Sequence, residues 1–133
     1  MASLFMLDTD VCSYLMKDAS PQLKQSILDH KNDTICISAV TYAELLFGIL
    51  NKQSKKLEKK LEQLLVLVQI IDWTDGAARK YAEVRRYLAQ KGIPIGNMDI
   101  LIAAAALAID AKLVTNNHKH FERIPNQKIA DWL

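Results

Sequence analysis

Short apolar runs alternate with segments of helical spacing along the chain, and this alternation limits the folds open to it. Short runs that are apolar throughout are typical of buried parallel strands, which are covered on both faces. Strands that alternate with helices in a short chain favour a mainly parallel sheet between two layers of helices. We therefore expect an α/β fold with three layers, α/β/α, whose strands lie at residues 4–7, 34–37, 68–71, 112–114 and, more weakly, 128–130.

The segments between these runs carry clear helical patterns. One helix is expected from about residue 75 to residue 90, ending at Lys91-Gly92. A Gly/Pro-rich turn then leads into an apolar helix at 100–109. The alanines of this apolar helix would let it lie close to the sheet. Another helix is expected after residue 50, and we interpret its apolar face as core or, in part, as a partner surface. This face consists of Leu57, Leu61, Leu64, Leu65 and Val68.

Size and composition restrict the class of protein. With 133 residues the chain is long enough for one domain, expected to span residues 1–133. A net charge of +2 is too small to indicate a nucleic-acid binder by itself. Cys12 and Cys36 form neither a disulfide framework nor a zinc pattern, so both are expected to be reduced core residues. The most apolar stretch, 98–109, is too short to span a membrane, so we expect a cytoplasmic protein without membrane contact.

An acidic pair follows the first apolar run. Asp8 stands where the first strand is expected to end, and Asp10 lies two residues further along. A carboxylate in the position of Asp8 is not explained by packing. Because Asp is among the best N-cap residues, either side chain could instead cap the following helix, an interpretation that suits Asp10 better than Asp8.

Two further acids are expected near the same edge of the sheet. Glu44 interrupts an apolar face of the helix after the second strand; it could form a capping box with Thr41, although Ser38 is the better N-cap. Asp99 falls in the first turn of the apolar helix, where the helix dipole alone could favour a negative charge. His30, His118 and His120 are interpreted as surface residues.

Asp8, Glu44 and Asp99 could converge, because ligand-binding residues in parallel α/β sheets gather at the carboxyl ends of the strands. Converging carboxylates repel one another unless a cation lies among them. Oxygen ligands without His or Cys favour Mg²⁺ or Mn²⁺. A metal centre of this kind suits phosphodiester hydrolysis, in which the ion activates water and stabilises charge on the phosphate.

Four segments resemble the PIN-domain family and, within it, the VapC-type toxins: MLDTDVC at 6–12, ISAVTYAELLFG at 37–48, IGNMDILIAA at 95–104 and LVTNNHKHFERI at 113–124. The resemblance implies an α/β/α PIN domain and a Mg²⁺- or Mn²⁺-dependent endoribonuclease that cleaves structured RNA such as tRNA or ribosomal RNA. It further implies the toxin of a type II toxin–antitoxin system, neutralised by a VapB-type antitoxin. Operator DNA would be contacted only through that antitoxin, and the toxin would form a homodimer.

Carried over to matching positions, the resemblance makes Asp8 and Asp99 metal ligands and lets Glu44 hold a metal-bound water or a second ion. Asn117 stands where a fourth acid is frequent and could ligate or orient a water through its carbonyl oxygen. Because Asn117 lacks a charge, we expect one firmly held ion and a second only with substrate. Two other positions depart from the common pattern, namely Asp10 in place of Asn and Asn97 in place of Pro.

Two rival functions start from the same residues. A phosphatase of the haloacid-dehalogenase type would use Asp8 as a nucleophile and Asp10 as the acid/base. The chain is short for that fold, lacks a persuasive catalytic lysine segment and would leave Glu44 without a role. A non-catalytic PIN-like binding module would use the acids to hold a structural ion or a partner's basic residue.

Overall fold

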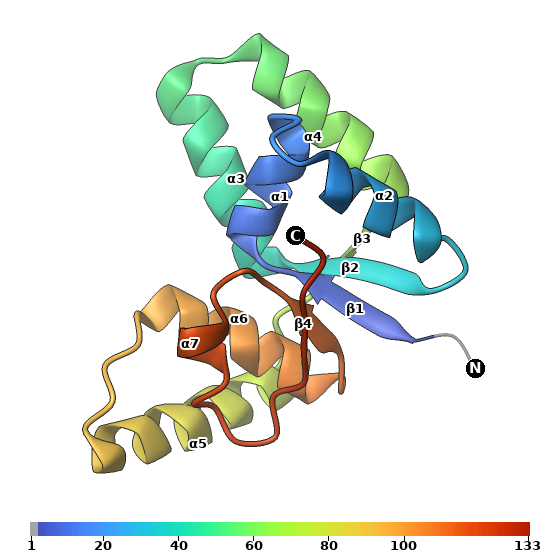
Figure 1. Ribbon diagram of the computed structural model, residues 1–133. Helices are drawn as coiled ribbons and strands as arrows, with labels where there is room; N and C mark the ends of the chain where they lie inside the picture. Colours follow the sequence, from blue (N-terminus) through green and yellow to red (C-terminus); the bar gives the residue numbers. More distant parts are fainter. Residues whose placement is uncertain (1–2) are drawn as a thin grey trace.

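The computed structural model describes residues 3–133, which form a five-stranded sheet with helices on both faces (Figure 1). All four neighbouring strand pairs are parallel, in the order β3-β2-β1-β4-β5. The expected α/β/α architecture with a parallel sheet is therefore confirmed. The strands are β1 (Leu4–Leu7), β2 (Thr34–Ser38), β3 (Gln69–Ile71), β4 (Lys112–Val114) and β5 (Ile129–Ala130).

The strand order explains why the helices form two layers. The chain moves from β1 to β2 and β3 on one side of the sheet and then returns to β4 on the other side of β1. Because crossovers between parallel strands are right-handed, this reversal places the later helices on the opposite face. Figure 1 shows α1 to α4 on one side and α5 to α7 on the other. The helices are α1 (Thr9–Met16), α2 (Pro21–Asp29), α3 (Ala39–Lys52), α4 (Lys55–Leu67), α5 (Asp75–Lys91), α6 (Asn97–Ala108) and α7 (His118–Phe121).

Each face of the sheet has its own apolar core, as the alternation of side chains along a strand requires. Phe5 and Leu7 of β1 pack in the core on the α1 to α4 side, whereas Met6 packs in the core beneath α5 and α6. Cys12 and Cys36 are buried free thiols, as expected, and burial raises the pKa of Cys36 to about 12. Among residues 3–133 no helix combines the length and apolar character needed to cross a membrane.

Helix α6 carries one of the expected site residues and is held firmly against the sheet. Its four consecutive alanines, 103–106, are all buried, as the composition predicted. Small side chains allow this close approach of helix and sheet, and Trp73 adds a hydrogen bond from Nε1 to the Leu101 carbonyl at 3.0 Å. The helix begins at Asn97, three residues before the apolar run, so Asp99 lies in its first turn.

Candidate active site

The candidate site lies at the carboxyl ends of β1 and β4, where the strand order reverses on either side of β1. The backbone N–H of Asp8 donates to the Val114 carbonyl at 3.1 Å, which fixes Asp8 beside the end of β4. Thr115, the residue after β4, is also buried. In open α/β sheets such a reversal point is the usual place for a ligand.

Asp8 is buried, with 5% of its surface exposed, and its side chain begins α1 by accepting a hydrogen bond from the Val11 N–H at 2.8 Å. The pKa of Asp8 is raised to about 6, chiefly by burial and to a smaller extent by the negative charges of Asp10 and Asp99. Hydrogen bonds from Thr115 and Val11 lower that pKa but do not offset burial. A carboxylate that caps a helix and is also costly to ionise is suited to a nearby cation.

Asp10 has a different position from the one favoured by the sequence. It lies exposed in the first turn of α1, while Asp8 supplies the N-cap. The preference for Asp10 as the capping residue is therefore wrong. Because Asp8 precedes the first helical residue, Thr9, its carboxylate can reach the third N–H of the helix, which Asp10, inside the first turn, cannot cap.

Glu44 is tied to the start of α1 by a hydroxyl group. Thr9 Oγ1 donates to Glu44 Oε1 at 2.6 Å and lies 3.2 Å from Thr41 Oγ1. The N-cap of α3 is Ser38, whose Oγ accepts from the Thr41 N–H at 3.1 Å, so the capping-box alternative for Glu44 does not apply. Glu44 is thus free of a capping role and is connected to the residue that follows Asp8.

Asp99 reaches the same edge from α6, close to the start of α7. Its Oδ2 atom lies 3.5 Å from Nδ1 of His120, and that nitrogen lies 2.9 Å from Nδ2 of Asn117. Asn117 immediately precedes α7 and provides no side-chain cap to it. The structure therefore brings Asp99 and Asn117 together, with His120 between them.

The three histidines, interpreted as surface residues, are all partly exposed, and each has a neighbour that the sequence did not indicate. His120 is partly buried against Asp99, and His30 is partly buried with its ring stacked on Trp132 at 4.3 Å between centroids. His118 is partly exposed and faces Asp131, with 3.6 Å between Nε2 and Oδ2. His120 is the histidine that shares the candidate site.

Oxygen donors of the right chemistry for Mg²⁺ or Mn²⁺ are present at this edge. The charge of Asp99 acts on Asp8, and a divalent ion would offset this repulsion and the cost of burial. Within residues 3–133, however, no three His, Cys, Asp or Glu side chains are already gathered as a ligand set. The donors fit such an ion, but Asp8, Glu44 and Asp99 must draw closer together to share it.

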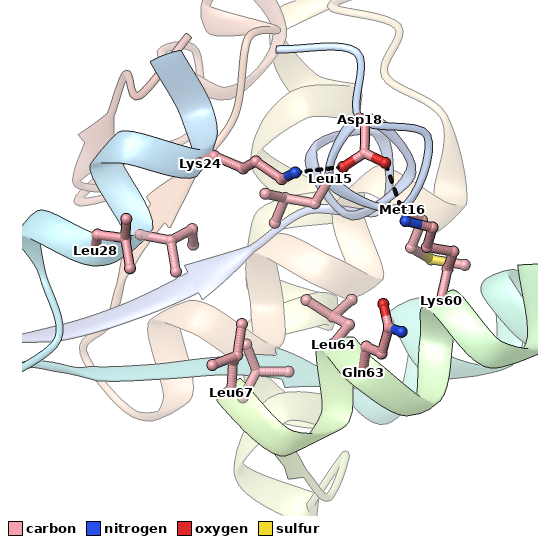
Figure 2. A pocket seen from close by; sticks show the side chains of 11 residues that line it. Leu15, Met16, Asp18, Lys24, Leu28, Lys60, Gln63, Leu64 and Leu67 are labelled. Atoms are coloured by element: carbon pink, nitrogen blue, oxygen red, sulfur yellow. Dashed lines mark hydrogen bonds and ion pairs between the residues drawn. The ribbon is translucent and has the colours of Figure 1, made fainter. Parts of the chain in front are cut away.

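A hollow lies away from these acids, between α1, α2 and α4 (Figure 2). It has a volume of about 310 Å³, and most of its lining is apolar, including Leu28 and Leu67. Asp18 bridges its rim by accepting from Lys24 at 2.6 Å and from Lys60 at 3.0 Å. We call this hollow the α2/α4 groove; its lining suits an apolar partner surface and not a phosphate.

Three residues around the acids were not identified from the sequence. Thr9 holds Glu44, Thr115 hydrogen-bonds Asp8, and His120 contacts Asp99. A signal for Thr9 was its place between two aspartates, and a signal for Thr115 was its place directly after a strand. His120 gave no such signal, because its partner, Asp99, lies 21 residues away in the sequence, on another helix.

A family model for the PIN domain matches residues 5–127. Ribonuclease VapC2 of Rickettsia felis is 40% identical over 131 residues, covering 97% of this chain and 98% of that protein. The tRNA(fMet)-specific endonuclease VapC of Salmonella typhimurium is 34% identical, with 96% and 97% of the two chains covered. Similarity therefore runs through nearly the whole chain.

Solved structures agree with these relatives. A chain in the crystal structure of VapBC2 from Rickettsia felis, bound to a DNA fragment from their promoter, superposes with a TM-score of 0.88 at 40% identity. That match covers 98% of this chain and 99% of the other. A chain of DNA-bound VapBC from Salmonella typhimurium gives a TM-score of 0.87 at 33% identity, with both chains fully covered. The protein thus belongs to the PIN-domain family and, within it, to the VapC group.

Proposed function

We propose that this chain, as one PIN domain over residues 1–133, is a metal-dependent endoribonuclease and the toxin of a toxin–antitoxin pair. The observation that carries the proposal is Asp8, a buried carboxylate with a pKa raised to about 6 at the point where the strand order reverses. Ionising such a group is costly for the fold, and a cation at this place offsets the cost. The relatives that match nearly the whole chain are named as a ribonuclease and an endonuclease, which supports this chemistry.

Asp8 and Asp99 would hold Mg²⁺ or Mn²⁺, with Glu44 binding a water or a second ion. The bound ion would supply an activated water and positive charge for the phosphate oxygens. The protein itself holds the carboxylate oxygens of Asp8 and Glu44 in position. Val11 N–H fixes one oxygen of Asp8, and Thr9 fixes Oε1 of Glu44, which leaves Oε2 to orient a water. Asn117 offers an uncharged carbonyl oxygen at the position where a fourth acid is frequent in the family.

Transfer RNA is the substrate that we propose, with ribosomal RNA as the second choice. One relative that matches 96% of this chain is named a tRNA(fMet)-specific endonuclease. Structured RNA presents phosphates in a fixed shape and unpaired bases in loops, which a metal-bound carboxylate centre can use for positioning. The cytoplasm holds these RNAs, so we propose that the protein acts there.

Purified protein should cleave tRNA at a defined position with Mg²⁺ or Mn²⁺, and EDTA should abolish cleavage, because no protein group replaces the ion in activating water. Mapping the RNA ends in total tRNA and ribosomal RNA measures this. Adding either metal in excess of EDTA is the control. Cleavage that continues in EDTA would contradict the metal-dependent mechanism, and hydrolysis of p-nitrophenyl phosphate without RNA cleavage would favour the phosphatase.

The α2/α4 groove is our proposed binding site for an apolar helix or strand of the VapB-type antitoxin. Its lining residues Leu28 and Leu67 are each 62% exposed, an uncommon exposure for large apolar side chains in a hollow. Two solved relatives are VapBC complexes bound to DNA, which supports an antitoxin partner and contact with operator DNA through it. We also propose that the protein forms a homodimer, as the family resemblance implies.

Leu67→Asp is expected to weaken antitoxin binding about 10-fold or more, because it places a charge in the apolar groove. Val66→Asp is the matched control: Val66 is the preceding residue of α4, is 84% exposed and does not line the groove. Calorimetric titration of each variant with the cognate VapB-type antitoxin measures the difference. Equal affinities for the two variants would place the antitoxin elsewhere.

A further inference from the structure

His120 occupies a position between two residues of the candidate site. Its Nδ1 atom lies 3.5 Å from Asp99 Oδ2 on α6 and 2.9 Å from Asn117 Nδ2 at the start of α7. The neighbouring residue, Phe121, is 1% exposed and packs in the core beneath α6. The buried Phe121 side chain therefore holds the backbone beside His120 in place, and the ring of His120 lies against Asp99 and Asn117.

The chemistry of these contacts depends on a single ring nitrogen. An ionised Asp99 can only accept a hydrogen bond, so the contact with Asp99 requires a hydrogen on Nδ1. Nδ1–H then also faces Asn117, whose amide can turn its oxygen toward the ring. In this arrangement one N–H group orients the carboxylate of Asp99 and the amide of Asn117 at the same time.

A carboxylate that ligates a metal is commonly fixed by a hydrogen bond from a neighbouring group, and removing that group typically costs 10-fold to 100-fold in metal affinity or activity. Asp8 has such partners in Val11 and Thr115. Glu44 has one in Thr9. For Asp99, His120 is the side-chain partner that the structure provides.

We propose that His120 is a positioning residue, which holds Asp99 and Asn117 in place for the divalent ion through Nδ1. This inference rests on the proposed function, since it assumes that Asp99 is a metal ligand. It assigns to the ring a role in metal affinity and turnover and none in direct contact with the RNA. The uncharged Asn117 makes this support more important, because no fourth carboxylate helps to retain the ion.

Three substitutions separate the two ring nitrogens. In His120→Asn the amide nitrogen occupies the place of Nδ1, whereas in His120→Gln it occupies the place of Nε2. His120→Ala removes both. His118→Ala is the matched control, because His118 lies on the same helix but faces Asp131.

The first readout is the dissociation constant of Mn²⁺ in the absence of RNA, measured by electron paramagnetic resonance. His120→Ala and His120→Gln are expected to bind Mn²⁺ about 10-fold more weakly than the wild type, and His120→Asn within about threefold of it. At fixed, subsaturating Mn²⁺ the second readout, RNA cleavage, should show a lower kcat with little change in KM. Melting temperatures without metal should be the same for all the variants.

Unchanged Mn²⁺ affinity in His120→Ala would overturn the inference, as would equal rescue by His120→Gln and His120→Asn. Asp99→Asn separates this failure from failure of the proposed function. If Asp99→Asn is inactive while His120→Ala behaves as wild type, only the role of His120 is wrong. If Asp99→Asn still cleaves RNA, the metal-dependent mechanism itself is wrong.

Discussion

Asp8→Asn is expected to lower the rate of RNA cleavage at least about 100-fold while the protein stays folded. Loss of a residue that merely supports a metal ligand costs 10-fold to 100-fold, so loss of a ligand itself should cost at least the upper value. Asparagine is as good an N-cap as aspartate and can still accept the hydrogen bond from Val11. The substitution therefore removes the charge and keeps the start of α1.

Asp10→Asn is the matched control for this experiment. It makes the same chemical change two residues away, at an exposed position in the first turn of α1. Cleavage of tRNA under single-turnover conditions should fall below detection for Asp8→Asn and stay within about threefold of wild type for Asp10→Asn. Wild-type cleavage by Asp8→Asn would remove Asp8 from the site, and equal losses in both variants would indicate a general effect of charge.

The second large effect concerns stability, and it follows from the pKa of the same carboxyl. In the folded protein burial raises this pKa from 3.8 to about 6. A raised pKa means that the folded state binds the proton more tightly than the unfolded state. The associated stability is fully present below pH 3.8 and is lost as the pH rises through about 6. The shift corresponds to a loss of about 3 kcal/mol of unfolding free energy in the metal-free protein at neutral pH.

Urea unfolding in EDTA, carried out from about pH 3 to about pH 7.5, measures this loss. Other groups titrate over the same range, so the informative quantity is the difference between the wild type and Asp8→Asn at each pH. The unfolding free energy of Asp8→Asn, relative to that of the wild type, should rise by about 3 kcal/mol from the lowest to the highest pH. Saturating Mg²⁺ at pH 7.5 should restore much of the loss to the wild type alone. Parallel pH curves for the two proteins would show that ionising Asp8 carries no such cost.

Most of the fold could be predicted from the sequence because a buried parallel strand needs apolar residues on both faces. The runs at 4–7, 34–37 and 112–114 satisfy this condition and match β1, β2 and β4 closely. The strand order was not predictable from the runs, since it depends on which faces the helices cover. The reversal on either side of β1 is what places Asp8 next to the end of β4.

The acids of the candidate site could be picked out from the sequence, but the residues that hydrogen-bond them could not. Asp8, Glu44 and Asp99 stand out because each interrupts apolar sequence. Their supports, Thr9 and His120, are ordinary polar residues whose partners lie 35 and 21 residues away, so no local pattern marks them. The choice of Asp10 as a cap failed for a different reason: which aspartate caps α1 depends on where the helix begins, and it begins at Thr9, directly after Asp8.

A Mn²⁺ titration of the RNA-free protein, comparing the wild type with Asp8→Asn and Asp99→Asn, is the most direct test of a metal centre built by these carboxylates. Because no three ligating side chains are already gathered among residues 3–133, binding must draw the acids together around the ion. The expected result is one firmly bound ion per wild-type chain and at least about 10-fold weaker binding in both variants. Equal uptake of Mn²⁺ by all three proteins would contradict it.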